Sequence, residues 1–150
     1  MTDIERIVYL EDSDDEVFLT RIVFDRERVA PELVHYARFE ALEGDLESGA
    51  LARLEHALVL VDLNLKLTKG TDAVRRLREM PAARGAVIGV CTGSEDPADR
   101  RDAIAAGADF FAAKPLDTTC LERICEAVAD LELVRGADGR VGLASARPTA

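Results

Sequence analysis

The chain has 150 residues, of which 48% are hydrophobic and 32% charged, which suffices for one globular domain with its own core. This composition excludes a disordered chain, a collagen-like chain and a small disulfide-stabilised scaffold. Nineteen Lys and Arg oppose 29 Asp and Glu, and the net charge of −10 disfavours direct binding to nucleic acid.

The sequence also bears on the cellular compartment of the protein and on whether it crosses a membrane. The longest aliphatic run, residues 57–61, is far shorter than the roughly 20 residues that a membrane helix needs. The first residues are acidic where a secretory signal is basic, so we expect a cytoplasmic protein that does not cross a membrane. Cys91, Cys120 and Cys125 show no CxxC spacing, which favours three reduced thiols over a disulfide or a zinc site.

The first third of the chain alternates between apolar runs and helical patterns. Residues 4–10 predict a strand, and Ser13 with Glu16 forms a capping box that begins a helix. Residues 33–39 predict a second strand, followed by a helix over about 40–54.

The middle of the chain repeats this alternation. Residues 57–61 and 86–91 predict two apolar strands, and a helical pattern that follows Gly70 lies between them. Asp96, followed by proline, predicts the start of the next helix, and Gly107 predicts its end.

The last part holds one more strand and one more helix. Residues 108–112 predict the fifth strand, and a capping box at Thr119 begins a helix that we expect to continue through Leu131. Glycines and a Ser-Ala-Arg-Pro-Thr-Ala end then predict a flexible tail over 134–150. We therefore expect one domain over 1–133, with no output domain after it.

Five apolar strands that alternate with five helices predict an α/β fold, a doubly wound five-stranded parallel sheet covered on both faces. In such sheets the functional site lies beyond the carboxyl ends of the strands. The loops after the strands are therefore where functional residues are expected.

These loops carry charged and hydroxyl side chains: Glu11 and Asp12 after the first strand, Asp62 after the third, Thr92 after the fourth and Lys114 after the fifth. Carboxylates gathered at one edge repel one another unless a cation lies among them, and oxygen ligands suit Mg²⁺. With the charge balanced, Asp62 could attack a phosphoryl donor while the metal and Lys114 withdraw charge.

Over residues 4–131 the chain resembles the receiver domain of two-component response regulators, which has a flavodoxin-like fold. The resemblance rests on five motifs: Tyr9-Leu-Glu-Asp-Ser-Asp-Asp, Leu60-Val-Asp-Leu-Asn-Leu with Gly70 eight residues after Asp62, Cys91-Thr-Gly-Ser, Ala106-Gly-Ala-Asp, and Ala113-Lys-Pro-Leu.

The resemblance implies that Asp62 accepts a phosphoryl group from a sensor histidine kinase or a phosphotransfer protein. Asp12 would bind Mg²⁺ directly, Glu11 would act through water, and the backbone carbonyl of Asn64 would complete the metal site with Asp62. The chain would then be a signalling phosphoacceptor that assists its own phosphorylation and dephosphorylation, and not an enzyme.

The resemblance also implies how the signal leaves the site. Lys114 would pair with the phosphoryl group, Thr92 would hydrogen-bond to it, and Phe111 would be the aromatic switch, although its ring could equally be core packing. The bond between Lys114 and Pro115 is expected to be cis.

The sequence departs from the family pattern at two positions. Lys66 stands where the family usually has proline, which adds a cation near the site. Gly93 stands where alanine is more common. We hypothesise that the missing methyl group admits the attacking water and shortens the phosphorylated lifetime.

Within the family, the chain looks like the stand-alone regulators that are paired with bacterial phytochromes. This rests on short strings: Asp-Asp-Glu-Val-Phe-Leu-Thr-Arg after the acidic pair, Asp62-Leu-Asn-Leu, and Thr92-Gly-Ser-Glu-Asp-Pro. A bacteriophytochrome is thus a candidate kinase, and the readout is expected to be a protein contact.

A homodimer through the face of the fourth helix, fifth strand and fifth helix is a further expectation. Candidates for its apolar patch on the last helix, unless they serve core packing, are Ala127, Leu131, Leu133 and Val134.

Three other functions compete with this interpretation, and the residues argue against the first two. A haloacid-dehalogenase-type phosphatase needs a second aspartate as general acid where Asn64 stands. A flavodoxin-like FMN carrier would need a phosphate loop where the acidic loop after the first strand repels phosphate. The third is an unphosphorylated scaffold or dimerisation module with the receiver fold.

Overall fold

Five parallel strands form the central sheet of the protein. The computed structural model describes residues 1–94 and 96–148, so Glu95 of the segment after Thr92 lies outside the described residues. The sheet has the order β3-β2-β4-β5-β6. Its strands are β2 (Arg6–Leu10), β3 (Glu32–Tyr36), β4 (Ala57–Asp62), β5 (Val87–Thr92) and β6 (Phe110–Ala113). The predicted doubly wound parallel sheet is confirmed.

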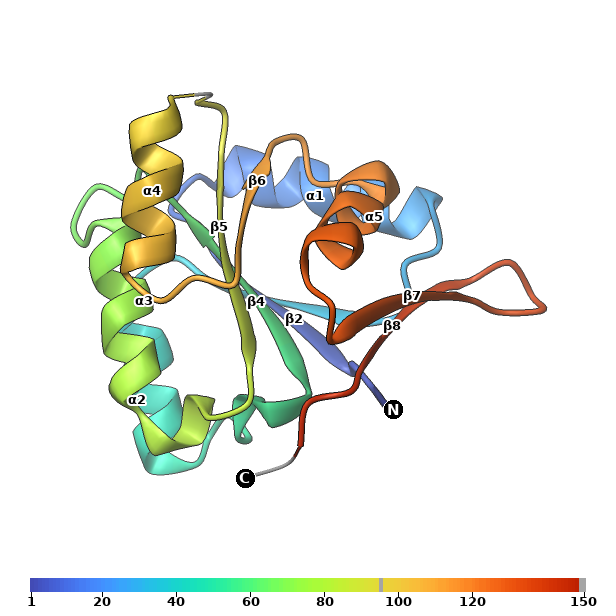
Figure 1. Ribbon diagram of the computed structural model, residues 1–150, viewed down its shortest axis with the longest axis horizontal. Coiled ribbons are helices and arrows are strands. Elements are labelled where there is room, and N and C mark those ends of the chain that lie inside the picture. Colours follow the sequence, from blue (N-terminus) through green and yellow to red (C-terminus); the bar gives the residue numbers. More distant parts are fainter. Residues whose placement is uncertain (95, 149–150) are drawn as a thin grey trace.

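Helices cover both faces of this sheet (Figure 1). One face carries α1 (Asp14–Arg26) and α5 (Thr118–Ala127), and the other carries α2 (Phe39–Ser48), α3 (Gly70–Glu79) and α4 (Pro97–Ala105). Short 3₁₀ turns, η1 (Leu54–His56) and η2 (Pro81–Ala83), precede β4 and β5. Side chains alternate along the buried strands. In β4, Leu58 and Leu60 enter the core under α1 and α5, while Val59 and Val61 enter the other core.

Two of the predicted helix starts are confirmed. The Ser13 hydroxyl accepts the Glu16 N–H at 3.3 Å at the start of α1. The Asp96 carboxylate accepts the Ala98 N–H at 2.9 Å, and Pro97 is the first residue of α4.

Two helix boundaries differ from expectation. The helix predicted over 40–54 ends at Ser48, because Gly49 adopts a left-handed conformation with φ of 81°. The cap of α5 is Asp117, whose carboxylate accepts the Cys120 N–H at 2.8 Å, so Thr119 lies inside the helix.

The predicted flexible tail over 134–150 is wrong for the described residues. Strands β7 (Leu131–Arg135) and β8 (Val141–Ser145) form a hairpin, and β8 pairs antiparallel with β1 (Thr2–Asp3). The tip of this hairpin projects away from the rest of the molecule (Figure 1). Its base belongs to the core, because Leu131, Val141 and Leu143 are at most 4% exposed. The domain therefore extends past the boundary predicted at residue 133, and residues 149–150 lie outside the described residues.

The last helix is shorter than predicted. It ends at Ala127, and Val128 is extended, with φ of −115° and ψ of 106°. Leu131, Leu133 and Val134 therefore lie on β7, and Ala127 alone of the predicted dimer patch remains on the helix.

The segment after β8 is held against the amino end of the central sheet. The Arg147 guanidinium donates to Asp109 Oδ1 at 2.8 Å and to the Ala86 carbonyl at 2.8 Å. None of the helices in the described part of the chain is long and apolar enough to span a membrane.

Candidate functional site

The strand register aligns the predicted site residues at the carboxyl edge of the sheet. Asp62, 5% exposed, is the last residue of β4. Thr92 ends β5 and pairs with Ala113 of β6, which places Lys114 directly beyond that edge. Glu11 follows β2, the other neighbour of β4. The strand register thus brings Glu11, Asp62, Thr92 and Lys114 to one edge of the sheet.

Gly70 lets the loop after Asp62 fold closely over the strand end. A Cβ atom at this position would lie 2.5 Å from the Asp62 carbonyl oxygen and 2.9 Å from Leu63 Cα, which is closer than side chains tolerate. The Gly70 N–H donates to the Leu63 carbonyl at 3.3 Å. The interval of eight residues between Asp62 and Gly70 thus has a steric cause.

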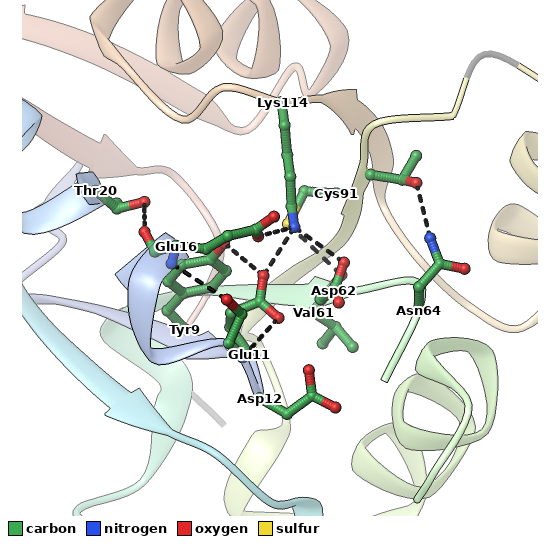
Figure 2. A network of polar contacts seen from close by, with 12 residues as sticks. Tyr9, Glu11, Asp12, Glu16, Thr20, Val61, Asp62, Asn64, Cys91 and Lys114 are labelled. Carbon is green, nitrogen blue, oxygen red and sulfur yellow. Dashed lines mark hydrogen bonds and ion pairs between the residues drawn. The ribbon is translucent and has the colours of Figure 1, made fainter. Parts of the chain in front are cut away.

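Three carboxylates gather beside the strand ends (Figure 2). Glu11, Asp12 and Asp62 each offer an oxygen, and these atoms all lie within 4.8 Å of one another. Glu11 and Asp62 are buried, and Asp12 is half-buried. A donor set made only of oxygens fits a hard divalent cation such as Mg²⁺ or Mn²⁺.

The electrostatics of Glu11 show how crowded this cluster is. Burial raises the pKa of Glu11 to about 8, the neighbouring Glu16 carboxylate adds to the rise, and Lys114 opposes it. A divalent cation among these oxygens would favour the ionised carboxylate and reverse the shift. A bound cation would therefore stabilise these carboxylates better than the charges of the protein alone do.

Lys114 is the basic group of the cluster. Its Nζ lies 2.8 Å from Glu11 Oε1 and 3.2 Å from Asp62 Oδ1, and it also contacts the Glu16 carboxylate (Figure 2). Burial works to lower the pKa of Lys114, but its hydrogen bonds with Glu11 and Glu16 raise it above the ordinary value. Lys114 is therefore a fixed positive charge beside Asp62, and its bond to Pro115 is cis, as predicted.

Thr92 offers a hydroxyl to the same edge. The side chain is fully buried, and its Oγ1 accepts the Ser94 N–H at 3.0 Å and the Asn64 amide at 3.5 Å. Because Oγ1 accepts both bonds, its own hydrogen is left to donate. The Asn64 side chain thus donates a hydrogen bond to Thr92. The metal-binding role of the Asn64 backbone carbonyl stays a prediction.

Phe111 lies on the neighbouring face of the molecule. Its half-buried ring packs against the core under α2, α3 and α4 and lines a cavity of about 220 Å³ between α4, β6 and α5. Its role as a switch stays a prediction.

Comparison with known proteins assigns the fold to a family. The family model for the response regulator receiver domain matches residues 26–128. This chain belongs to that family. The matched part of the receiver begins after Glu11 and Asp12, so their place in the site rests on the structure.

Solved structures similar to this receiver domain support the fold. The bacteriophytochrome response regulator AtBRR is 17% identical with a TM-score of 0.70, over 84% of this chain and 93% of that chain. The Mn²⁺-bound form of response regulator Rcp1 is 19% identical with a TM-score of 0.64, over 80% and 88%. The chemotaxis response regulator CheY4 of Vibrio cholerae is 17% identical with a TM-score of 0.65, over 83% and 99%. No curated protein sequence matches the chain.

Sequence reasoning missed two contacts in the receiver site. Glu16 was interpreted only as part of a capping box, yet its carboxylate turns to Lys114 and leaves the Ser13 N–H to Glu11 Oε2 at 3.4 Å. The Lys66 N–H donates to Asp12 Oδ2 at 2.8 Å, a bond that proline at this position could not make. A backbone donor gives no signal in the residue pattern.

Proposed function

We propose that Asp62 accepts a phosphoryl group from the phosphohistidine of a sensor kinase or phosphotransfer protein. The carrying observation is the buried Asp62 carboxylate with the Lys114 ammonium at 3.2 Å and two further carboxylates within 4.8 Å. Asp62, Glu11 and Asp12 would hold Mg²⁺, which would neutralise charge on the transferred group.

In the transfer, an Asp62 carboxylate oxygen forms a bond to phosphorus while the bond from phosphorus to the imidazole nitrogen of the donor breaks. The electron pair of that bond stays on the imidazole, which becomes neutral by proton exchange with water. Lys114 and the Thr92 hydroxyl are positioned to donate hydrogen bonds to phosphoryl oxygens. The protein is thus a phosphoacceptor that later loses its phosphoryl group to water, and not an enzyme acting on a separate substrate.

An apolar surface next to the site supports a protein donor. Phe18 and Leu19 on α1 are 64% and 60% exposed, and Ile22 is 38% exposed. Leu19 also lines a cavity of about 300 Å³ that reaches Lys114 and Pro115. A kinase that docks on α1 would bring its phosphohistidine to Asp62.

A bacteriophytochrome is the sensor that we propose first. Two of the similar structures, AtBRR and RtBRR, are bacteriophytochrome response regulators, with TM-scores of 0.70 and 0.68. Their identity of 17% and 18% reaches no further than the fold, so this choice rests on the motifs after Asp62 and Thr92 as well. Such a kinase domain works in the cytoplasm, where we expect the protein.

The readout that we propose is protein contact, including a homodimer through α4, β6 and α5. Ile104 on α4 is 47% exposed, and the cavity beside Phe111 is rimmed by Arg100 and Arg123. Equilibrium sedimentation at micromolar concentration tests this. A monomer both with and without phosphorylation would contradict the dimer.

The phosphorylation itself is tested with acetyl phosphate and intact mass. The wild type should gain about 80 Da only when Mg²⁺ is present, because Asp62 alone lacks charge neutralisation. Asp62→Asn should gain nothing, and Asp72→Asn, which changes an exposed aspartate on α3, should gain as the wild type does. No gain by the wild type with acetyl phosphate or with a cognate kinase would favour the scaffold alternative.

A further inference from the structure

The surroundings of Lys114 contain one more charge than the proposed chemistry uses. The ammonium group has three hydrogens and three carboxylate partners, Glu11, Asp62 and Glu16 (Figure 2). Two of these hydrogens are donated to Glu11 and Glu16, while Asp62 Oδ1 lies 3.2 Å from Nζ as an ion-pair partner. A phosphoryl group on Asp62 would therefore meet an ammonium group that Glu11 and Glu16 already hold.

The three partners differ in how easily they can leave. The side chains of Glu11 and Asp62 are 1% and 7% exposed; Asp62 ends one strand of the central sheet, and Glu11 directly follows another. The Glu16 side chain is 45% exposed and comes from the first turn of α1, so water can replace Lys114 there. Glu16 is thus the partner that the structure holds least firmly.

The negative charge of Glu16 also indicates that it is the partner a phosphoryl group would displace. The Glu16 side chain contacts the Lys114 ammonium from the solvent-exposed side of the cluster. A doubly charged phosphoryl group on Asp62 would meet this carboxylate across the Lys114 ammonium. The two anions would compete for the same donors.

We infer that Glu16 is a positioning residue, which holds Lys114 in the resting protein and competes with the aspartyl phosphate for it. This inference rests on the proposed phosphorylation of Asp62. Glu16 touches neither the phosphorus nor the attacking oxygen, and it acts by setting how much of the time Lys114 is free. The competition shortens the phosphorylated lifetime and slows phosphorylation.

The test compares Glu16→Gln with Asp15→Asn. Glutamine keeps the length of the side chain but binds an ammonium group more weakly than a carboxylate does. Asp15 is an exposed acid in the same helical turn, so its variant reproduces the change in helix charge without the Lys114 contact. In Glu16→Gln we expect acetyl phosphate to act about threefold faster and the aspartyl phosphate to last about threefold longer, as for one solvent-accessible ion pair.

A second measurement needs no phosphorylation. The ammonium signal of Lys114 in ¹⁵N-edited NMR reports how well its hydrogens are protected from exchange with water. Exchange should be faster in Glu16→Gln than in the wild type and unchanged in Asp15→Asn. A merely structural role in capping α1 would move both variants together.

The outcomes separate the two proposals. If the wild type is not phosphorylated, the proposed function fails, while the Lys114 signal still tests the contact. If the wild type is phosphorylated and Glu16→Gln has an unchanged or shorter lifetime, the inference about Glu16 is overturned.

Discussion

The two edges of the central sheet use the same kinds of side chain with different charge balance. At the carboxyl edge, Glu11 and Asp62 share Lys114, and the pKa of Glu11 is raised to about 8, first by burial. At the amino edge, Arg78 and Arg147 hold Asp109 at 2.7 and 2.8 Å. Burial works to raise the pKa of Asp109, but its hydrogen bonds with Arg147, the Ile88 N–H and Arg78 lower it.

This difference in charge distinguishes the candidate functional site from a structural ion cluster. Asp109 is half-buried, yet its two oxygens accept four charged or backbone donors, so it needs no further partner. Around Glu11 the acids outnumber the bases, and the excess negative charge suits a cation and a phosphoryl group. Charge balance, rather than burial, separates the structural cluster from the site.

The largest expected effect concerns the hairpin that carries Arg147 to the amino edge. Leu143→Ala should lower the free energy of unfolding by about 3 kcal/mol, because the side chain is 2% exposed and packs in the core. Urea denaturation measures this loss. Leu67→Ala, which truncates a leucine that is 71% exposed near the carboxyl edge, should change stability by less than about 0.5 kcal/mol. Equal effects of the two variants would mean that the hairpin is not part of the core.

The second prediction concerns the charge-balanced cluster around Asp109 at the amino edge. Asp109→Asn should cost about 2 kcal/mol, because it removes the partly buried carboxylate that Arg78 and Arg147 share and leaves Arg147 only the exposed Asp130. Asp72→Asn removes an exposed pair with Arg75, whose N and O atoms are 3.0 Å apart, and should cost less than about 0.5 kcal/mol. If Asp109→Asn proves as mild as this control, the amino-edge cluster does not stabilise the fold.

The same variant has a pH signature. The pKa of Asp109 is lower in the folded than in the unfolded protein, so its stabilisation is complete above the unfolded value of about 3.9. The stabilisation is lost as the pH falls through the folded pKa. The difference in stability between wild type and Asp109→Asn should therefore be constant from pH 7 to 5 and shrink below about pH 4. A difference that grows on acidification would have the wrong sign for this pair.

The position of the candidate site could be predicted because each of its residues is recognised from its own neighbours in the sequence. Each of Asp62, Thr92 and Lys114 follows an apolar run, and parallel strands bring their ends together without further information. The hairpin could not be recognised in this way. Leu131 and Leu133 continue the apolar pattern of α5, and β8 finds its partner β1 at the other end of the chain. Its pairing is thus non-local, and flexible-looking glycines hide it.

Glu16 and Lys66 show a second limit of sequence patterns. The capping box already accounted for a glutamate at position 16, so nothing in the sequence indicated the contact between Glu16 and Lys114. For Lys66 the side chain attracted attention, but the contact that matters is made by its backbone N–H. Contacts chosen among several satisfied alternatives require the three-dimensional structure.

The third prediction separates these two properties of Lys66 at the carboxyl edge. Lys66→Pro removes the N–H that orients Asp12 and should weaken Mg²⁺ binding about fivefold. Lys66→Ala keeps the N–H and removes a positive charge, so it should strengthen Mg²⁺ binding about twofold. Mg²⁺ titration followed by amide chemical shifts measures both. Changes in the same direction would show that the bond to Asp12 does not organise the metal site.

The smallest expected effect is at Gly93, beside Thr92. A Cβ atom there would meet no atom within 4 Å, so Gly93→Ala fits without strain. If the missing methyl group admits the attacking water, the alanine variant should lose its phosphoryl group about twofold more slowly, which is a barrier change of about 0.4 kcal/mol. Gly44→Ala on α2 also has open space at its Cβ and should stabilise the helix without changing this rate. An unchanged rate in Gly93→Ala would show that water reaches the aspartyl phosphate by a route that this methyl group does not obstruct.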